Sequence, residues 1–367
     1  METKSATQQA LKIVDCDVHV TPKDGVRSLL PYMTKAWSTQ FETFARLKRE
    51  VKRHPFRYPN PTGAINRWDA VPPSGGEPGS DLEYLQVDLL QKWHISEALL
   101  VPVEWVNAWT DPRLASAYLS ALNDYFIQEW LPADNRLRYA LVVSPHDPVS
   151  AAAEIRRHAA SRHVGAVFLP LLNLMMGHTW FNPVYEAAQE TDLPVVSHAT
   201  GGEGTYQGAP TLAGGVPQTY AERNVSNFAL GMANTVNMVF EGVFERYPKL
   251  RVVFIEWGFT WLPSTLWRMD KRWRELRSEI PWVRRPPSEY VFEHLRYTTQ
   301  PVDGPDNQEE FVPFLKALRA EQTLLFSTDY PHWDNDDPFK VFTGLPQDLK
   351  RRIYSENALE TFGQRFQ

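Results

Sequence analysis

Short apolar runs rich in β-branched residues alternate with longer amphipathic stretches along almost the whole chain. Runs of about four to eight such residues are typical of buried strands, whereas apolar positions three or four apart indicate helices. The expected strands are Leu11–Val18, Glu97–Val101, Leu137–Val143, Gly165–Leu169, Pro194–Ser197, Leu250–Ile255, Leu295–Thr299 and Thr323–Ser327. The expected helices are Asp81–Lys92, Pro112–Trp130, Pro148–Ala160, Pro183–Thr191, Tyr220–Arg246, Trp261–Glu279, Glu309–Ala320 and Asp348–Phe362.

This alternation favours one α/β domain over residues 1–367. Eight strands that are each followed by a helix are typical of a (β/α)8 TIM barrel. A doubly wound open sheet is the competing architecture, but no Gly-rich phosphate-binding turn follows the first expected strand. The sequence therefore predicts the barrel.

Two stretches are longer than a minimal barrel requires. Residues 21–80 follow the first strand and are dense in Pro and Gly at 55–61 and 72–80, and residues 199–218 follow the fifth strand and contain six glycines. Loops that follow the strands of such a barrel gather at its C-terminal mouth, where barrel enzymes build their sites. We expect both stretches to cap that mouth.

Charge and composition narrow the class of protein. Lys and Arg number 38 against 44 Asp and Glu, a net charge of −6, which argues against a surface that binds nucleic acid or an anionic membrane. A hydrophobic content of 43% is ample for a large core. The single cysteine, Cys16, fits a reducing compartment, and no apolar run approaches the length of a membrane span. We therefore expect a soluble, cytoplasmic protein that acts on a small molecule. We also expect it to form a homo-oligomer, namely a dimer.

Polar side chains end four of the expected strands. Asp17 and His19 alternate on one face of the first strand, His198 ends the fifth, Glu256 the sixth and Asp329 the eighth. Each has a plainer explanation when taken alone, such as a His–Asp pair or a capping histidine. Together they would meet at one barrel edge, where two imidazoles and carboxylates suit a divalent ion. Zn²⁺ is the first choice, with Mn²⁺ or Fe²⁺ as alternatives.

The order of these motifs resembles the second amidohydrolase family, and the similarity covers nearly the whole chain. The matching motifs are Asp15-x-Asp17-x-His19, Leu193-Pro-Val-x-x-His198, Arg251-Val-x-Phe-x-Glu256 and Ser327-Thr-Asp329-Tyr-Pro-His332. That family consists of metal-dependent TIM barrels and includes aminocarboxymuconate-semialdehyde decarboxylase and γ-resorcylate decarboxylase. The resemblance implies that Asp17, His19, His198 and Asp329 are the metal positions.

The chain departs from the characterised decarboxylases at two of these positions. Asp17 stands where they carry His or Glu, and Glu256 stands where they carry a catalytic His at the end of the sixth strand. A carboxylate there could bind metal, act as an acid or base, or hold the site in shape. His332 is a candidate for the missing imidazole, although a loop histidine packed on Trp333 is an equally plain interpretation.

These residues suggest roles in a reaction on a small organic molecule. Asp329 would take a proton from water, and Glu256 or His332 would protonate the leaving group. Candidate substrate contacts follow strands and suggest an aromatic pocket, namely His178, Trp180, Trp257 and Trp333. His178 could equally belong to a surface loop, and most aromatic residues are simply core.

Loss of the histidine at the sixth strand favours a hydrolase acting on an aromatic or carboxylate-bearing molecule. A metal-dependent non-oxidative decarboxylase of the same family is the alternative, because fold alone does not choose between the two reactions. A non-catalytic metal-binding barrel is a third reading. Surplus acids such as Glu256 argue against it, since structural metal sites favour a closed shell of four ligands.

Overall fold

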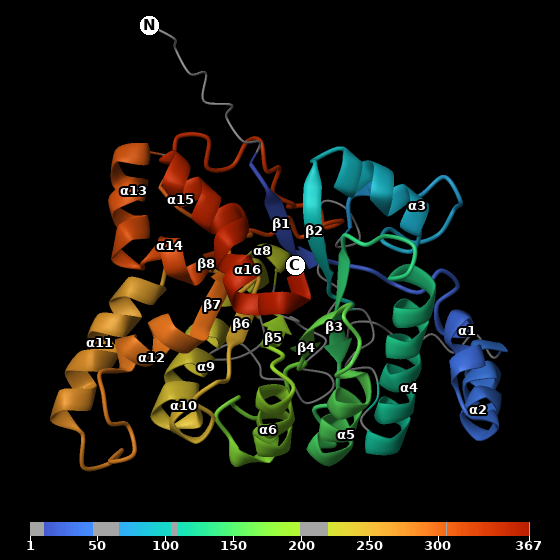
Figure 1. The fold of residues 1–367 in the computed structure, drawn as a ribbon, viewed down its shortest axis with the longest axis horizontal. Helices are drawn as coiled ribbons and strands as arrows, with labels where there is room; N and C mark the ends of the chain where they lie inside the picture. Colours follow the sequence, from blue (N-terminus) through green and yellow to red (C-terminus); the bar gives the residue numbers. More distant parts are fainter. Residues whose placement is uncertain are drawn as a thin grey trace, which may run out of the picture.

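The computed structural model describes residues 11–46, 66–103, 109, 111–198, 219–305 and 307–366. Eight parallel strands form one sheet in the order β1 to β8, and helices surround it (Figure 1). The strands are β1 (Ile13–Val18), β2 (Ile95–Leu100), β3 (Leu137–Val142), β4 (Val164–Phe168), β5 (Val195–His198), β6 (Val252–Ile255), β7 (Leu295–Thr298) and β8 (Leu324–Leu325). The predicted (β/α)8 barrel is confirmed.

Backbone hydrogen bonds join the two edges of this sheet. The Cys16 N–H donates to the Phe326 carbonyl at 3.0 Å, and the His19 N–H donates to the Tyr330 carbonyl at 2.7 Å. Val18 and Tyr330 also form a parallel bridge. These contacts bring the chain after β8 beside the end of β1, so the barrel closes where two of the predicted polar motifs lie.

Helices follow the strands in the expected alternation. Their bounds are α1 (Val26–Leu29), α2 (Lys35–Arg46), α3 (Leu82–Leu85), α4 (Pro112–Tyr125), α5 (Pro148–His158), α6 (Asn182–Glu190), α8 (Tyr220–Ser226), α9 (Phe228–Phe240), α10 (Val243–Arg246), α11 (Leu262–Glu275), α12 (Pro287–His294), α13 (Gln308–Ala317), α14 (Ala320–Thr323), α15 (Gln347–Arg351) and α16 (Asn357–Phe362). π-Helical segments extend α3 over Gln86–Gln91 and α4 over Phe126–Trp130, and link α15 to α16 over Arg352–Glu356. Within the described residues, no helix combines the length and apolar character needed to cross a membrane.

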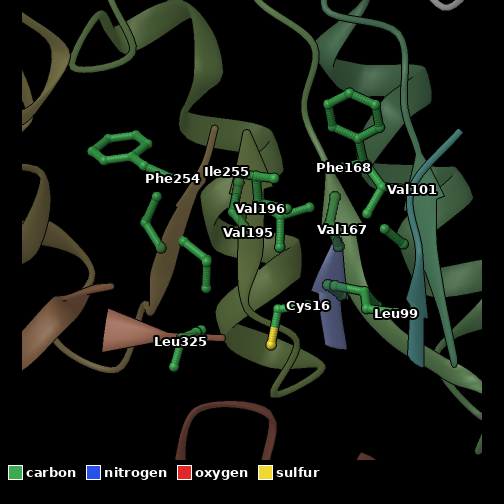
Figure 2. Close-up of a cluster of buried hydrophobic side chains, with 14 of the residues drawn as sticks. Cys16, Leu99, Val101, Val167, Phe168, Val195, Val196, Phe254, Ile255 and Leu325 are labelled. Atoms are coloured by element: carbon green, nitrogen blue, oxygen red, sulfur yellow. The ribbon is translucent and has the colours of Figure 1, made fainter. Parts of the chain in front are cut away.

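The core lies inside the barrel and between strands and helices. Strand side chains such as Val167, Val196 and Ile255 are fully buried, and Figure 2 shows them in a cluster with Leu99 and Cys16. Burial of apolar strand residues on both faces is what a parallel sheet covered by helices requires. Cys16 is a free, buried thiol whose pKa burial raises well above its usual range, so it is inert.

Several boundaries differ from the prediction for local physical reasons. The stretch 220–246 divides into α8, α9 and α10, and Gly242 lies between the last two at a φ of +68°, a conformation that ends helices. β8 is shorter than expected because the Ser327 N–H donates to the side-chain Oγ1 of Thr299, at 3.2 Å, and not to a backbone carbonyl that would continue the ladder with β7. Helices α1, α2 and α12 were not predicted.

The described parts of residues 21–80 take two different positions. The Arg67 N–H donates to the Pro331 carbonyl at 2.8 Å, and Asn66 bridges His332, so residues 66–80 run beside the loop after β8. Helix α1 instead packs against α4 at the side of the barrel (Figure 1). Residues 47–65 and 199–218 lie outside the described residues. The cap over the mouth therefore stays a prediction.

Gly79 supports the backbone that leads out of β1. It has a φ of +79°, and a Cβ there would lie 2.6 Å from the His19 carbonyl oxygen. Gly75 has a similar φ of +82° but no atom within 4 Å of such a Cβ. We expect Gly79→Ala to lower the free energy of unfolding by at least about 1 kcal/mol more than Gly75→Ala, because only the former adds a clash to the conformational cost. Urea unfolding of both variants measures this difference, and equal losses would contradict it.

Candidate metal centre and active site

All four predicted metal positions meet at the C-terminal mouth of the barrel. Asp17 lies in β1, His19 follows it, His198 ends β5 and Asp329 follows β8. Each offers one ligand atom, and these atoms all lie within 4.8 Å of one another. All four side chains are buried, with at most 5% of each residue exposed. The barrel thus gathers nitrogen and oxygen donors from three strands at one point.

A hydrogen bond to the backbone of Val101 fixes the orientation of the His19 ring. Its Nδ1 lies 2.9 Å from the Val101 carbonyl oxygen, which can only accept a hydrogen bond. In the neutral ring Nδ1 therefore carries the proton, and Nε2 is left with a free lone pair. That Nε2 lies 2.7 Å from Asp329 Oδ1 and 3.4 Å from Asp17 Oδ1. This tautomer and direction are those of a metal-binding histidine.

Several atoms of the cluster that could bind a metal ion have no hydrogen-bond partner among the described residues. They are both carboxylate oxygens of Asp17, both ring nitrogens of His198 and Oδ2 of Asp329. Leaving buried polar atoms unpaired costs free energy, and a bound cation removes that cost. The donor set of two imidazoles and two carboxylates therefore fits a divalent ion.

Two carboxylate residues at this mouth have unusual backbone conformations. Glu256 has a φ of +59° and Asp329 a φ of +62°. Residues other than glycine seldom adopt such angles, which cost on the order of 1–3 kcal/mol and cluster at functional sites. The Glu256 N–H donates to Thr298 Oγ1 at 3.0 Å, and the Asp329 N–H donates to the Asp17 carbonyl at 3.1 Å. The neighbouring strands thus hold both carboxylates where their strands end.

A second group of donors, Glu256, Asp329 and His332, overlaps the first. Their ligand atoms also lie within 4.8 Å of one another. His332 Nδ1 is 2.7 Å from Asp329 Oδ1, and the His332 ring stacks on His19 with centroids 4.3 Å apart. Glu256 Oε2 lies 3.2 Å from His198 Nε2. The structure thus brings both candidate acids of the sequence analysis to the cluster.

The environment drives the pKa values of two neighbouring carboxyls in opposite directions. Burial, followed by repulsion from Asp329, raises the pKa of Glu256 well above its usual range, although Arg223 opposes this. Burial would also raise the pKa of Asp329, but His332 and His19 outweigh it and lower that pKa below its usual range. Glu256 is therefore protonated beside an ionised Asp329. In enzymes, such a difference between the pKa values of two neighbouring carboxyls assigns one the role of acid and the other the role of base.

The two histidines of the first group are also perturbed. Burial lowers the pKa of His198, which keeps this ring neutral and able to bind a cation. Burial acts in the same sense on His19, but Asp17 and Asp329 outweigh it and raise its pKa to about 9. A metal ion competes for the same Nε2, so ion binding releases this proton.

Asp15 is a part of the site for which the sequence analysis assigned no role. Its buried carboxylate accepts hydrogen bonds from the Thr328 N–H at 2.9 Å, the Thr328 hydroxyl at 2.6 Å and the Asp17 N–H at 3.2 Å. It therefore ties β1 to the loop after β8 directly beside Asp17 and Asp329. Two sequence features could have indicated this role. Asp15 stands two residues before Asp17, and the hydroxyl residue Thr328 stands directly before Asp329.

This arrangement predicts how Asp15 variants behave. Asp15→Ala leaves two buried N–H groups unpaired, at a cost of about 1–3 kcal/mol each, so we expect a large loss of stability. Asp15→Asn keeps an oxygen that accepts from both amides, and the Thr328 hydroxyl can turn to accept from its NH₂ group. We expect less than half the loss in the Asn variant. Urea unfolding measures the stability of both variants. Equal losses of stability would contradict the role of the Asp15 hydrogen bonds in joining β1 to the loop after β8.

The predicted aromatic contacts are distributed differently. Trp257 is fully buried, stacks on Phe254 with ring centroids 4.6 Å apart, and lies against Gly231 of α9. Its side chain therefore belongs to the layer between β6 and α9 and not to the mouth. The prediction missed this because the backbone turns at Glu256, which ends the alternation of the strand.

Two further candidates, His178 and Trp180, lie in the loop after β4, and a third, Trp333, lies in the loop after β8. His178 is exposed and accepts a hydrogen bond from the Trp180 N–H at 3.0 Å, and the indole N–H of Trp180 donates to the Pro145 carbonyl at 2.9 Å. Trp180 is 44% exposed and Trp333 is 38% exposed. These three remain candidates for contacts at the rim.

A pocket opens beside the stacked rings of His19 and His332. Its lining combines residues after β1, β2 and β8 with the segment 66–80, namely His19, Val20, Thr21, Asn66, Glu77, Pro78, Val103, Pro331 and His332. Its volume of about 20 Å³ gives room for a water molecule beside the two histidines. A (β/α)8 barrel with such a pocket and titratable cluster at its C-terminal mouth has the organisation of a barrel enzyme.

Comparison with known proteins identifies the family. The model of the family described as amidohydrolase matches residues 14–364. The chain therefore belongs to the amidohydrolase family, and the resemblance inferred from the sequence motifs is confirmed.

Solved structures share the fold. 5-Carboxyvanillate decarboxylase from Sphingomonas paucimobilis is 19% identical, with a TM-score of 0.66 over 96% of this chain and 99% of that one. A 5-carboxyvanillate decarboxylase from Novosphingobium aromaticivorans with bound manganese is 16% identical, with a TM-score of 0.68 over 97% and 98%. An amidohydrolase from Mycobacterium avium subsp. paratuberculosis is 19% identical, with a TM-score of 0.70 over 96% and 100%.

Proposed function

We propose that the protein is a metal-dependent hydrolase that acts on a small aromatic or carboxylate-bearing molecule. The observation that carries this proposal is the pair of opposed carboxyls, Glu256 with its raised pKa and Asp329 with its lowered pKa, beside buried histidines. One residue can then give a proton while the other takes one at the same pH. The acidic net charge of −6 also supports a small-molecule substrate in place of a nucleic acid.

Asp17, His19, His198 and Asp329 would hold the ion. When bound, a divalent ion polarises a substrate oxygen and makes water a better nucleophile at neutral pH. The two imidazoles support Zn²⁺, whereas the carboxylates and the manganese in the Novosphingobium decarboxylase support Mn²⁺, and Fe²⁺ suits the same donors. Metal analysis of protein purified without chelators, followed by reconstitution with each ion, distinguishes them.

The side chains around the ion divide the proton transfers. Asp329 accepts a proton from the attacking water, and His332, at 2.7 Å from its Oδ1, stabilises its charge. The protonated carboxyl of Glu256 then donates to the leaving group. His178, Trp180 and Trp333 would contact the distal part of the substrate at the rim.

A non-oxidative decarboxylase is the second candidate function, because two of the proteins that share the fold are 5-carboxyvanillate decarboxylases. In that reaction the bond between the ring carbon and the carboxylate breaks, CO₂ leaves, and the electron pair stays on the carbon. Glu256 would then protonate that carbon. The same residue serves both proposals, so the substrate decides between them.

A substrate screen tests these proposals. Reconstituted protein is incubated with aromatic lactones, amides and esters and, separately, with hydroxylated aromatic carboxylates. Ring opening or cleavage without CO₂ supports the hydrolase, and CO₂ release supports the decarboxylase. Bound metal without turnover on any of them would favour the non-catalytic metal-binding barrel. Sizing of the same sample tests the proposed homodimer, and a cytoplasmic location stays a prediction from the cysteine content.

A further inference from the structure

We propose that a recess between α4 and α5, on the outer side of the barrel, binds a small neutral molecule that carries several hydroxyl groups and has about the size of a monosaccharide. The recess has a volume of about 320 Å³, which lies within the range of small-molecule pockets, about 300–1,000 Å³. It shares no lining residue with the pocket beside His19 and His332. The inference depends neither on the metal site nor on which reaction the enzyme catalyses.

Three elements of the barrel enclose the recess. α4 and α5, which are neighbours around the barrel (Figure 1), form its walls, and the end of β3 with the two residues after it forms its floor. Small side chains predominate on both walls, namely Ser116 and Ser120 on α4 and Ser150, Ala151 and Ala153 on α5. Larger side chains at these positions would fill the space between the two helices.

A network of polar side chains bridges the two walls. Arg157 of α5 donates to Asp124 and to the Ser120 hydroxyl of α4, at 2.9 Å each. Arg157 also donates to Glu154, one turn earlier in α5, at 2.8 Å. Glu154 in turn accepts from Asn123 of α4 at 2.9 Å. The helices are thus joined through polar groups, and the small side chains beside this network leave the recess open.

Asn123 also fixes the floor of the recess. This fully buried side chain accepts from the Val142 N–H at 3.0 Å and donates to the Val142 carbonyl at 2.9 Å, so it pairs with β3 as a neighbouring strand would. It also accepts from the Tyr139 hydroxyl at 3.1 Å. Walls and floor are therefore held in place before a ligand arrives, which lowers the entropic cost of binding.

The charges in the recess argue against a charged ligand. Arg157 is the cation of the lining, and both Asp124 and Glu154 lie against it. Burial would raise the pKa of Glu154, but hydrogen bonds from His158 and Arg157 outweigh it and lower this pKa to about 2, so the carboxylate is ionised. An anion would meet a guanidinium that is already neutralised. A cation would meet a carboxylate that already accepts hydrogen bonds from its neighbours.

Hydroxyl groups provide the hydrogen bonds that remain for a ligand. The serines of the lining are Ser116, Ser120, Ser144 and Ser150. The Ser144 hydroxyl accepts from the His146 N–H at 3.3 Å and can still donate its own hydrogen. The Ser120 hydroxyl lies 3.5 Å from its acceptor on Glu154, which is long for such a bond, so it can turn toward a ligand.

The rest of the lining is mainly aliphatic, as at Leu119, Val142 and Val143. Each hydroxyl of a polyol can both donate and accept, which suits serines, while its C–H groups can contact the aliphatic side chains. A neutral polyol therefore matches both parts of the lining.

Titration with myo-inositol tests the ligand class. Ligand-observed NMR on the full chain should give a dissociation constant on the order of 1 mM, the affinity of an ordinary ligand of this size. Cyclohexylamine and cyclohexanecarboxylate carry a cation and an anion on the same carbon ring. Each should bind at least about 10-fold more weakly, because its charge finds no free partner. Equal or tighter binding of either compound would overturn the proposed class, and no binding of myo-inositol would overturn the site.

Two substitutions that fill the recess from opposite walls locate the site. Ala153→Trp introduces a large side chain at an exposed position of α5, and Ser120→Leu introduces one on α4, where leucine favours the helix. Each should weaken binding of myo-inositol by about 10-fold or more. Val149→Trp is the matched control, because it adds the same indole at an exposed position of α5 outside the lining. This control should bind as the wild type does, and circular dichroism should show that all three variants are folded.

Hydrogen exchange followed by mass spectrometry gives an independent location. Amides of α4 and α5 should exchange more slowly when myo-inositol is bound, and those of the loop after β8 should not change. Protection at the mouth in place of the two helices would overturn the inference. So would unchanged binding in both filled variants. Neither result bears on whether the enzyme hydrolyses its substrate at the metal site.

Discussion

Replacing both His19 and His198 by alanine is expected to prevent binding of the divalent ion and to abolish turnover. The two imidazoles are the nitrogen donors of the first ligand group, and the remaining carboxylates of Asp17 and Asp329 hold zinc poorly on their own. Metal analysis after dialysis should give roughly one ion per chain for the wild type and almost none for the double variant. Activity should fall to the background of the assay.

A surface histidine provides the control for this experiment. His178→Ala removes an exposed imidazole in the loop after β4 and should leave the metal content unchanged, whatever it does to substrate binding. Far-ultraviolet circular dichroism should show the same secondary structure in both variants. Full metal content in the double variant would mean that the ion binds elsewhere.

The barrel could be predicted because its determinants are local. Most strands are largely apolar runs buried on both faces, as in Val164–Phe168, and a helical pattern separates each from the next. Polar residues such as His198 and Glu256 were recognisable at the ends of such runs. Since parallel strands end at one mouth, His198 and Asp329 could be placed together from the sequence although they are far apart in it.

Details that depend on contacts between distant segments could not be predicted. The tie from Asp15 to Thr328 joins β1 to the loop after β8, and neither residue reveals it alone. The stacking of His332 on His19 depends on how the chain turns after Asp329, whose φ of +62° is unusual for its residue type. The same applies to Trp257, which a turn at Glu256 directs toward α9.

The role of Glu256 leads to the second prediction. Glu256→Gln keeps the shape of the side chain but removes its proton and its charge. His19, His198, Asp17 and Asp329 are unchanged, so the variant should fold and retain the metal ion. We expect turnover to fall by at least about 10²-fold, the usual contribution of a general acid. Glu186→Gln, which removes an exposed carboxylate on α6 outside the pocket lining, should keep nearly all activity.

The dependence of turnover on pH tests the same assignment. The mechanism requires an ionised Asp329 and a protonated Glu256, so wild-type turnover should hold between the lowered pKa of Asp329 and the raised pKa of Glu256 and decline above the latter. A bound cation lowers the pKa of Glu256, which moves this decline to lower pH without removing it. The residual activity of Glu256→Gln should lack the decline. If that variant turns over normally, Glu256 is structural and His332 is the acid. If it loses the metal ion, Glu256 is a ligand of that ion, and its carboxyl is not the proton donor.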